Sequence, residues 1–174
     1  PPVDPKSVPG RGAEVEAFVA DGDAQRKLAG SLRVADVDPD AYAAVFLAGG
    51  HGAMWDLATD PAVARLLGRV YAGGRVVAAV CHGPGGLIGA RKPDGSPLVE
   101  GHRVAGFSND EEAAVGLVDV VPFALETRLR ELGGRYEKGP NWAPFAVRDG
   151  QIVTGQNPGS SRRVALEVLA ALGL

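Results

Sequence analysis

The stretch from Arg75 to Gly86 constrains the fold more than any other part of the sequence. A short apolar run rich in β-branched residues, residues 76–80, leads into Cys81, the only cysteine of the chain. His82 follows, and then one proline and three glycines within four positions. A short apolar run bounded by such residues is typical of a buried strand that ends in a sharp turn. We therefore expect Cys81 to lie at a strand-to-helix corner.

A cysteine at such a corner has two interpretations. The corner pushes the side chain away from the backbone, and the N–H groups at the start of the next helix favour a thiolate. This interpretation predicts a reactive thiol with a pKa below that of a free cysteine. The alternative is a buried structural cysteine that packs as a small apolar residue. The adjacent His82 and the glycines around it favour the reactive thiol.

The composition excludes several classes of protein. A chain of 174 residues with 45% hydrophobic and 22% charged residues predicts one globular domain, residues 1–174, with a substantial core. The net charge of −3 and the lack of a basic stripe argue against nucleic-acid binding. No apolar run approaches the ~20 residues that span a membrane. A single cysteine excludes an internal disulfide and fits a reducing, cytoplasmic compartment. The histidines and the cysteine have no metal-ligand spacing, so we expect no metal and no cofactor.

Alternating strands and helices predict an α/β fold with a parallel sheet. Residues 43–48 form a second buried strand, which ends in Gly49-Gly50-His51-Gly52. Asp60 and Pro61 are a helix cap and first turn, and the helix that follows ends at Gly73. Strand, helix and the strand before Cys81 make one βαβ unit. The apolar face of this helix consists of Val63, Leu66, Leu67 and Val70.

The remaining elements have weaker signals. We expect a loop over residues 1–12, helices over residues 23–31, 87–90 and 122–132, turns over 36–40 and 92–95, and a strand over 103–107; residues 14–20 fit a strand or a helical turn. Asp149-Gly150 predicts a hairpin that joins residues 145–148 to residues 151–154. The last helix begins at Ser160 or Ser161. Its predicted apolar face is Ala165, Val168, Leu169 and Leu172.

Two predicted strands end in glycine clusters, and parallel strands bind ligands at their carboxyl ends. If the strands are neighbours, the N–H groups of Gly50 and His82 meet beside Cys81. They would then form an oxyanion hole, which requires a backbone without side chains in the way.

His82 is the obvious base for Cys81, although it could instead point away and cap a helix. His51 is expected to be a wall of the pocket rather than a base, and His102 a solvated surface residue. An acid that orients the base is expected from the helix that Ser108 begins. Glu111 fits a capping box with Ser108, whereas Glu112 points about 100° further round the helix and is free to serve. A solvated helix face, or Glu111 as the acid, is the alternative.

Four motifs occur together in order: residues 48–52 (AGGHG), 79–84 (AVCHGP), 104–108 (VAGFS) and 153–158 (VTGQNP). With the opening residues 2–7 (PVDPKS), this set resembles the DJ-1/PfpI superfamily and its Hsp31-like branch. The resemblance implies a flavodoxin-like three-layer sandwich with a mostly parallel sheet, and a homodimer. It also implies Cys81 as nucleophile, His82 as its partner and Glu112 as the acid.

The resemblance implies a function as well. Members of this branch are described as glutathione-independent glyoxalases, so we expect a small 2-oxoaldehyde such as methylglyoxal as substrate and D-lactate as product. A stress-response chaperone, a protein deglycase or a redox sensor is the alternative, and an amidase or peptidase is a third. Our candidates for the pocket are Gly49, His51, Trp55, Trp142 and Asn157.

One departure from the family pattern concerns the start of the chain. The family has a strand, a helix and a strand before the PVDPKS motif, and this unit supplies a glutamate beside the cysteine. Such a unit takes about 30 residues or more, and here the sequence starts after it. The expectation is a fragment, a separate N-terminal segment that acts as a partner, or a natural variant.

Overall fold

The structure, a computed structural model, describes residues 12–174 and divides into two compact units, Pro1–Val37 and Asp38–Leu174. The expected loop at residues 1–12 and the PVDPKS motif lie outside the described residues, apart from Gly12. No helix within residues 12–174 is long and apolar enough to cross a membrane.

The described part of the first unit is helical. It contains α1 (Ala13–Ala20), α2 (Gly22–Ala29) and the 3₁₀ helix η2 (Val34–Asp36). The Asp21 side chain accepts hydrogen bonds from the first N–H groups of α2, which begins this helix as an N-cap residue does. Residues 14–20, for which the sequence left strand and helix open, are therefore a helix, and the helix predicted at 23–31 is confirmed.

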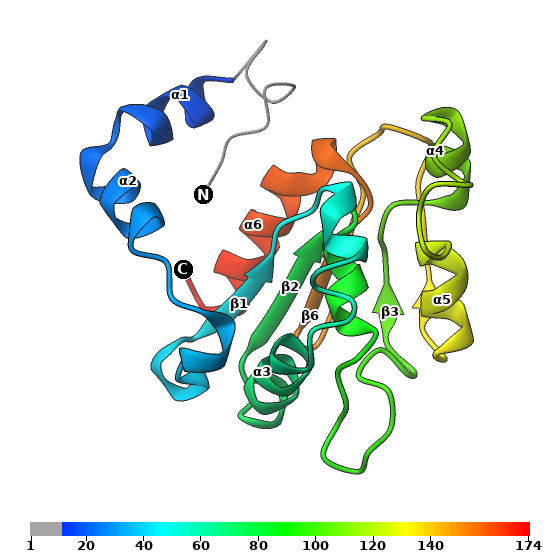
Figure 1. The fold of residues 1–174 in the computed structure, drawn as a ribbon, viewed down its shortest axis with the longest axis horizontal. Helices are drawn as coiled ribbons and strands as arrows, with labels where there is room; N and C mark the ends of the chain where they lie inside the picture. Colours follow the sequence, from blue (N-terminus) through cyan, green and yellow to red (C-terminus); the bar gives the residue numbers. More distant parts are fainter. Residues whose placement is uncertain (1–11) are drawn as a thin grey trace. The chain divides into compact units, whose positions relative to one another are not determined.

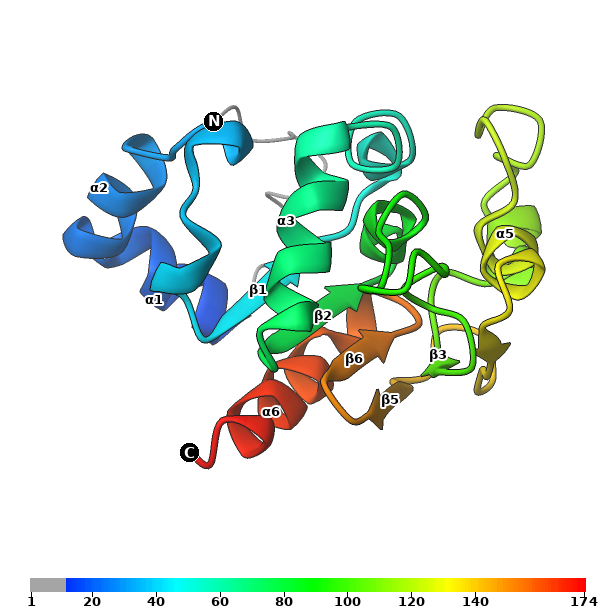
Figure 2. The same cartoon turned by 90° about the horizontal axis from the view of Figure 1, so that it is seen from below.

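The second unit is built on a four-stranded sheet in the order β1 (Ala44–Leu47), β2 (Val76–Val80), β6 (Ile152–Gly155) and β5 (Ala146–Asp149). The first three strands are parallel, and β5 is antiparallel to β6 across the predicted hairpin. Helix α3 (Pro61–Ala72) packs on one face of the sheet and α6 (Ser161–Ala171) on the other (Figures 1 and 2). The predicted three-layer α/β sandwich is confirmed.

Strand β2 is the centre of this sheet, because β1 and β6 flank it and all five of its residues are buried. Helix α3 begins as predicted: the Asp60 side chain accepts a hydrogen bond from the Ala62 N–H, and Pro61 occupies the first turn. Of the predicted apolar face of α3, Val63, Leu67 and Val70 are buried. The βαβ unit that leads to Cys81 is thus fixed by local signals.

A smaller layer lies beside this sheet (Figure 1). It contains β3 (Arg103–Val104), β4 (Arg135–Tyr136), α4 (Asn109–Ala114) and α5 (Leu125–Glu131). The strand predicted at 103–107 ends at Val104, because the next backbone groups bond elsewhere. The N–H of Ala105 donates to the Thr154 hydroxyl, and that of Phe107 donates to the Cys81 carbonyl. The helix predicted at 122–132 is likewise shorter than expected.

The helix predicted at residues 87–90 is wrong. The chain forms a 3₁₀ helix, η5 (Gly83–Leu87), directly after Cys81 and His82. Proline and glycine are poor residues for an α-helix, and three of the five residues of η5 are glycines. A side chain on Gly83 would collide with the Leu47 carbonyl at the end of β1. The glycines therefore allow η5 to pack closely against the neighbouring strand.

The predicted buried face of α6 is also wrong. Val164 is the buried residue of this helix, whereas Leu169 is 44% exposed. Gly155 of β6 explains the shift, since a side chain at that position would collide with Val164. The helix thus turns Val164 toward β6 and leaves Leu169 outside. Phe46 of β1, expected in a buried strand, is 41% exposed because β1 is the edge of the sheet within the described residues.

Candidate active site

Cys81 occupies a strained corner at the end of β2. Its φ angle is 61°, in the left-handed region that non-glycine residues rarely adopt. The corner is held on both sides: the Cys81 N–H donates to the Gly155 carbonyl, and the Cys81 carbonyl accepts from the Phe107 N–H. This is the backbone geometry that the sequence predicted for the corner.

Two backbone amides converge on the Cys81 sulfur. The N–H groups of Gly50 and His82 both form hydrogen bonds with it, and these are the amides expected to make the oxyanion hole. Gly50 has a φ of 108°, a conformation that favours glycine. A side chain on Gly49 would have its Cβ 2.6 Å from the Cys81 Cβ, so only glycine allows this approach.

His82 joins Cys81 to Glu112. Its side chain is fully buried, its Nδ1 lies 3.4 Å from the Cys81 Sγ, and its Nε2 lies 2.8 Å from the Glu112 Oε2. An ionised carboxylate only accepts hydrogen bonds, so the hydrogen-bond pattern assigns the proton to Nε2. The lone pair of Nδ1 then faces the sulfur, where it can accept the thiol proton.

The pKa shifts of Cys81 and His82 argue against the expected thiolate. Burial raises the pKa of the Cys81 thiol more than the two amides lower it, and the carboxylates of Glu111 and Glu112 raise it further. Burial also lowers the pKa of His82, although its hydrogen bond to Glu112 opposes this. Cys81 and His82 are therefore neutral at rest. The predicted low thiol pKa is wrong, because desolvation of the thiol outweighs the hydrogen bonds from the Gly50 and His82 amides.

Glu111 and Glu112 are consecutive residues of α4, but their side chains have different partners. Ser108 and Glu111 form the predicted capping box, in which the Ser108 hydroxyl accepts from the Glu111 N–H and the Glu111 carboxylate accepts from the Ser108 N–H. Glu112, the next residue, turns toward His82 and is almost fully buried. The helical periodicity thus brings Glu112, and not Glu111, to His82.

Glu111 ties three segments together around the site. It is fully buried, and its Oε1 accepts hydrogen bonds from the Trp142 N–H and the Asn157 side-chain amide. Burial by itself would raise the pKa of Glu111, but the hydrogen bonds from Trp142, Asn157 and Ser108 together lower it. Glu111 is consequently an ionised structural acid that connects α4 with the loops on either side of β5 and β6.

His51 has a partner that the sequence did not reveal. Its Nε2 lies 2.9 Å from the Glu112 Oε1, so Glu112 accepts hydrogen bonds from two histidines, one on each oxygen. The centroids of the His51 and His82 rings are 4.1 Å apart. Among residues 12–174, these three side chains are also the group whose potential metal-ligand atoms lie within 4.8 Å of one another. The two hydrogen bonds account for that approach.

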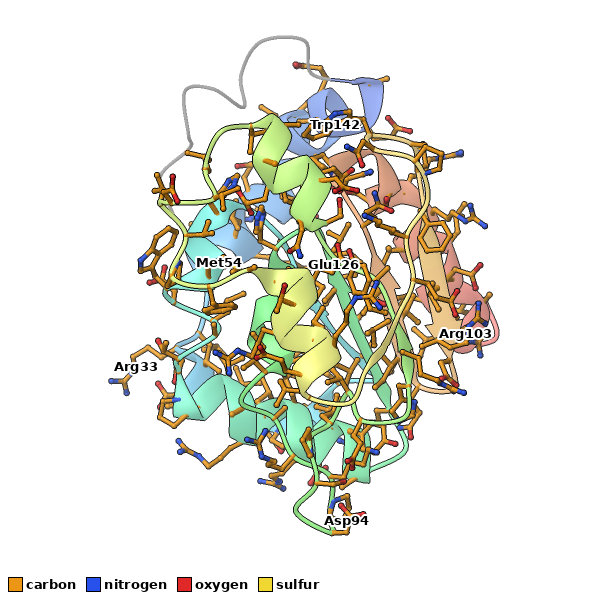
Figure 3. All side chains as sticks on the ribbon, turned by 90° about the vertical axis from the view of Figure 1, so that its right-hand side faces the viewer. Arg33, Met54, Asp94, Arg103, Glu126 and Trp142 are labelled. Atoms are coloured by element: carbon orange, nitrogen blue, oxygen red, sulfur yellow. The ribbon has the colours of Figure 1, made fainter. Side chains whose placement is uncertain are left out.

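Aromatic rings surround His82. The centroids of the Phe107 and His82 rings are 4.4 Å apart, and those of the Trp142 and Phe107 rings are 5.8 Å apart. Trp142 is half-exposed and has a φ of 66°, a conformation that its hydrogen bond to Glu111 helps to hold. Figure 3 shows Trp142 at the opposite end of this view from Asp94, which lies in the predicted turn at 92–95.

The other two pocket candidates, Asn157 and Trp55, differ in burial. Asn157 is fully buried, and its amide donates to Glu111 and to the Ala143 carbonyl. Trp55 follows the 3₁₀ helix η4 (His51–Met54) and is exposed, and its ring makes none of the aromatic contacts found in residues 12–174. The sequence did not indicate a small cavity of about 190 Å³ that reaches Glu112. Its lining consists of Asn109, Glu112, Val118, Val121 and Ala124.

His102, expected to be a solvated surface residue, is instead partly buried. Its Nε2 lies 3.0 Å from the Tyr71 hydroxyl and its Nδ1 lies 3.5 Å from an Asp149 oxygen. The partners come from α3 and from the end of β5, which are remote in sequence. Nothing in the local sequence around His102 signals these contacts.

The sequence of this chain is similar to those of curated proteins. A curated relative, Glyoxalase 3 of Candida albicans, is 34% identical over 146 residues, which cover 80% of this chain and 61% of the relative. Another, the glutathione-independent glyoxalase HSP31 of Saccharomyces cerevisiae, is 33% identical over 159 residues, 87% of this chain and 67% of the relative. The chain thus spans about three fifths to two thirds of these proteins.

Solved structures agree with the sequence matches. The Rapid Encystment Protein of Francisella tularensis has a TM-score of 0.92 at 36% identity, over 98% of this chain and 76% of that one. Glyoxalase III of Candida albicans has a TM-score of 0.86 at 31% identity, over 92% of this chain and 70% of that one. The sequence pattern of the DJ-1/PfpI family matches residues 13–171. This chain therefore belongs to the DJ-1/PfpI family.

Proposed function

We propose that this chain carries the reactive centre of a glutathione-independent glyoxalase, which converts methylglyoxal to D-lactate. The observation that carries the proposal is the continuous path from the Cys81 sulfur through His82 to Glu112, with two amides directed at the sulfur. Relatives with glyoxalase names support the substrate class. Because the chain spans only part of those relatives, the activity of the whole protein is part of the proposal.

The first step starts from the neutral Cys81 thiol and the neutral His82 ring. As the Cys81 sulfur attacks the aldehyde carbon, the thiol proton moves to Nδ1 of His82, and the new imidazolium is stabilised by Glu112. The aldehyde oxygen becomes an oxyanion between the N–H groups of Gly50 and His82. His82 then returns the proton to this oxygen, which gives a neutral hemithioacetal on Cys81.

The second step is an isomerisation followed by hydrolysis. His82 removes the proton from the former aldehyde carbon and passes it to the ketone oxygen, which gives an enediol. His82 then takes the proton of the hydroxyl on the sulfur-bound carbon and delivers a proton to the neighbouring carbon, so the enediol becomes a lactoyl thioester. Water then cleaves the thioester to lactate and regenerates the Cys81 thiol. The net reaction adds one water to methylglyoxal. It draws only on the side chains, the amides and the solvent.

The test is turnover of methylglyoxal in the absence of glutathione, followed as lactate formation. The protein should form lactate, and Cys81→Ala should abolish this activity while the melting temperature stays close to that of the wild type. Ammonia or peptide release from amide substrates, with no lactate, would support hydrolysis instead. Lactate formation that persists in Cys81→Ala would overturn the proposal.

The family resemblance also leads us to propose a homodimer in a reducing, cytoplasmic environment. Light scattering across micromolar concentrations checks the assembly, and a monomer throughout would refute it.

A further inference from the structure

We infer that His51 is a positioning residue of this site: by donating a hydrogen bond to the second oxygen of Glu112, it fixes the carboxylate that selects the proton position on His82. The inference deepens the proposed function, and only its kinetic test rests on that function. The sequence predicted His51 as a wall of the pocket, for which bulk alone is sufficient. A positioning role instead requires its N–H group.

The two oxygens of the Glu112 carboxylate have different partners. Oε2 lies 2.8 Å from the His82 Nε2, and Oε1 lies 2.9 Å from the His51 Nε2. The two histidines come from different segments, one from the start of η4 and one from the corner after β2. The carboxylate is therefore held by two independent loops as well as by its own helix.

Without the His51 hydrogen bond, the Glu112 side chain would be less constrained. The side chain is almost fully buried, so an oxygen without a hydrogen bond there is unfavourable. The cavity of about 190 Å³ beside Glu112 gives the carboxylate space to rotate away from His82. The His51 hydrogen bond opposes this rotation because it satisfies Oε1 in the position where Oε2 meets His82.

The position of the Glu112 carboxylate decides which nitrogen of His82 carries the proton. The fully buried His82 ring has Cys81 on one nitrogen and Glu112 on the other. Only the tautomer with the proton on Nε2 leaves Nδ1 free to accept the thiol proton. A carboxylate fixed at Nε2 stabilises that tautomer, so a loosened carboxylate admits the inactive one.

His51 is accessible enough for its bulk and its hydrogen bond to be separated by mutation. Its side chain is 35% exposed, and the centroid of its ring lies 4.1 Å from that of His82 and 5.9 Å from that of Phe107. His51→Phe keeps a ring at this place and removes the donor. His51→Gln removes the ring and keeps an N–H donor of similar reach. His51→Leu is a second variant without a donor.

The first experiment measures the tautomer directly and does not depend on any substrate. The ¹⁵N chemical shifts of the His82 ring, recorded in the protein with labelled histidine and a chelator present, show which nitrogen carries the proton. We expect Nε2 to carry it in the wild type and in His51→Gln, and both tautomers to be populated in His51→Phe and His51→Leu. An unchanged His82 spectrum in both donor-free variants would overturn the inference.

The second experiment measures kcat and KM with methylglyoxal. The donor-free variants should lose about 10-fold in kcat, a small part of what an acid–base group contributes, with KM within about 3-fold of the wild type. His51→Gln should restore kcat. In a Glu112→Gln background, His51→Phe should have no further effect on kcat. A Gln variant as poor as the Phe variant, or a loss confined to KM, would make His51 a pocket wall. If the wild type does not turn over methylglyoxal, the proposed function fails while the spectra still decide the role of His51.

Discussion

The His82–Glu112 pair and the His102–Asp149 pair lie in the same unit of this protein, and their surroundings give them different chemical capacities. His82 is fully buried, and among residues 12–174 the side chain of its carboxylate, Glu112, accepts hydrogen bonds from two histidines, 2.8 Å and 2.9 Å away. His102 is partly exposed and lies 3.5 Å from Asp149. Asp149 also accepts hydrogen bonds from the Arg103 N–H and the Arg135 guanidinium.

The two pairs differ in the group that each histidine contacts through its other ring nitrogen. On the side away from its carboxylate, His82 meets a sulfur at 3.4 Å, whereas His102 meets the Tyr71 hydroxyl at 3.0 Å. A thiol is a far better nucleophile than a phenol, and the Gly50 amide beside Cys81 has no counterpart in the hydrogen bonds described for Tyr71. A histidine–carboxylate pair is thus a reactive centre only where its partners include a nucleophile and a place for the developing charge.

The largest expected difference is between the kcat/KM values of variants at His82 and at His102. His82→Gln should lower kcat/KM for methylglyoxal by about 10²–10⁴-fold, because it removes the group that moves protons. His102→Gln should leave kcat/KM within about 2-fold of the wild type, since that pair lies outside the site. Equal losses in both variants, with circular dichroism showing that both proteins are folded, would mean that the two histidines do not differ in catalytic role.

A smaller effect separates the two carboxylates. Glu112→Gln should lower kcat by about 10–100-fold, less than the loss of His82, because the base remains but its tautomer is no longer selected. Asp149→Asn should leave kcat unchanged and lower the free energy of unfolding by about 0.5–1.5 kcal/mol, because it weakens hydrogen bonds with Arg103, Arg135 and His102. Denaturant titration and steady-state kinetics on both variants make the comparison. A kcat for Glu112→Gln equal to that of the wild type would contradict the account.

The smallest effect is on the pH dependence of stability. Burial lowers the pKa of both His82 and His102 in the folded protein. Below the unfolded value of about 6.5, the unfolded chain therefore binds protons that the folded protein does not, so stability falls as the pH falls. His82→Gln should flatten this decline more than His102→Gln, because His82 is the more deeply buried. Urea unfolding between about pH 7.5 and 5 measures the slope, and a steeper contribution from His102 would reverse the order.

Local signals made much of the fold predictable. The apolar run before Cys81 gave β2, Asp60 and Pro61 gave the start of α3, and Asp149-Gly150 gave the hairpin, because each structure depends on neighbours in sequence. The capping box at Ser108 even separated Glu111 from Glu112, since helical periodicity sets the direction of consecutive side chains.

Contacts between distant segments were not predictable in the same way. His51 meets Glu112 across 61 positions of sequence, and Tyr71 meets His102 across 31. The buried side of α6 depends on the space above Gly155, which only the folded sheet defines. The thiol pKa was misjudged for the same reason: the corner was visible in the sequence, but the extent to which the fold removes the Cys81 thiol from water was not.

The central claim is that a neutral Cys81 thiol and a neutral His82, held by Glu112, make up the reactive centre. The most direct test is the pH dependence of iodoacetamide labelling of Cys81, the only cysteine of the chain, in the native protein. Because burial and the nearby carboxylates raise the pKa of this thiol, the labelling midpoint should lie above that of glutathione measured alongside. A midpoint below that of glutathione would show a resting thiolate and contradict the account.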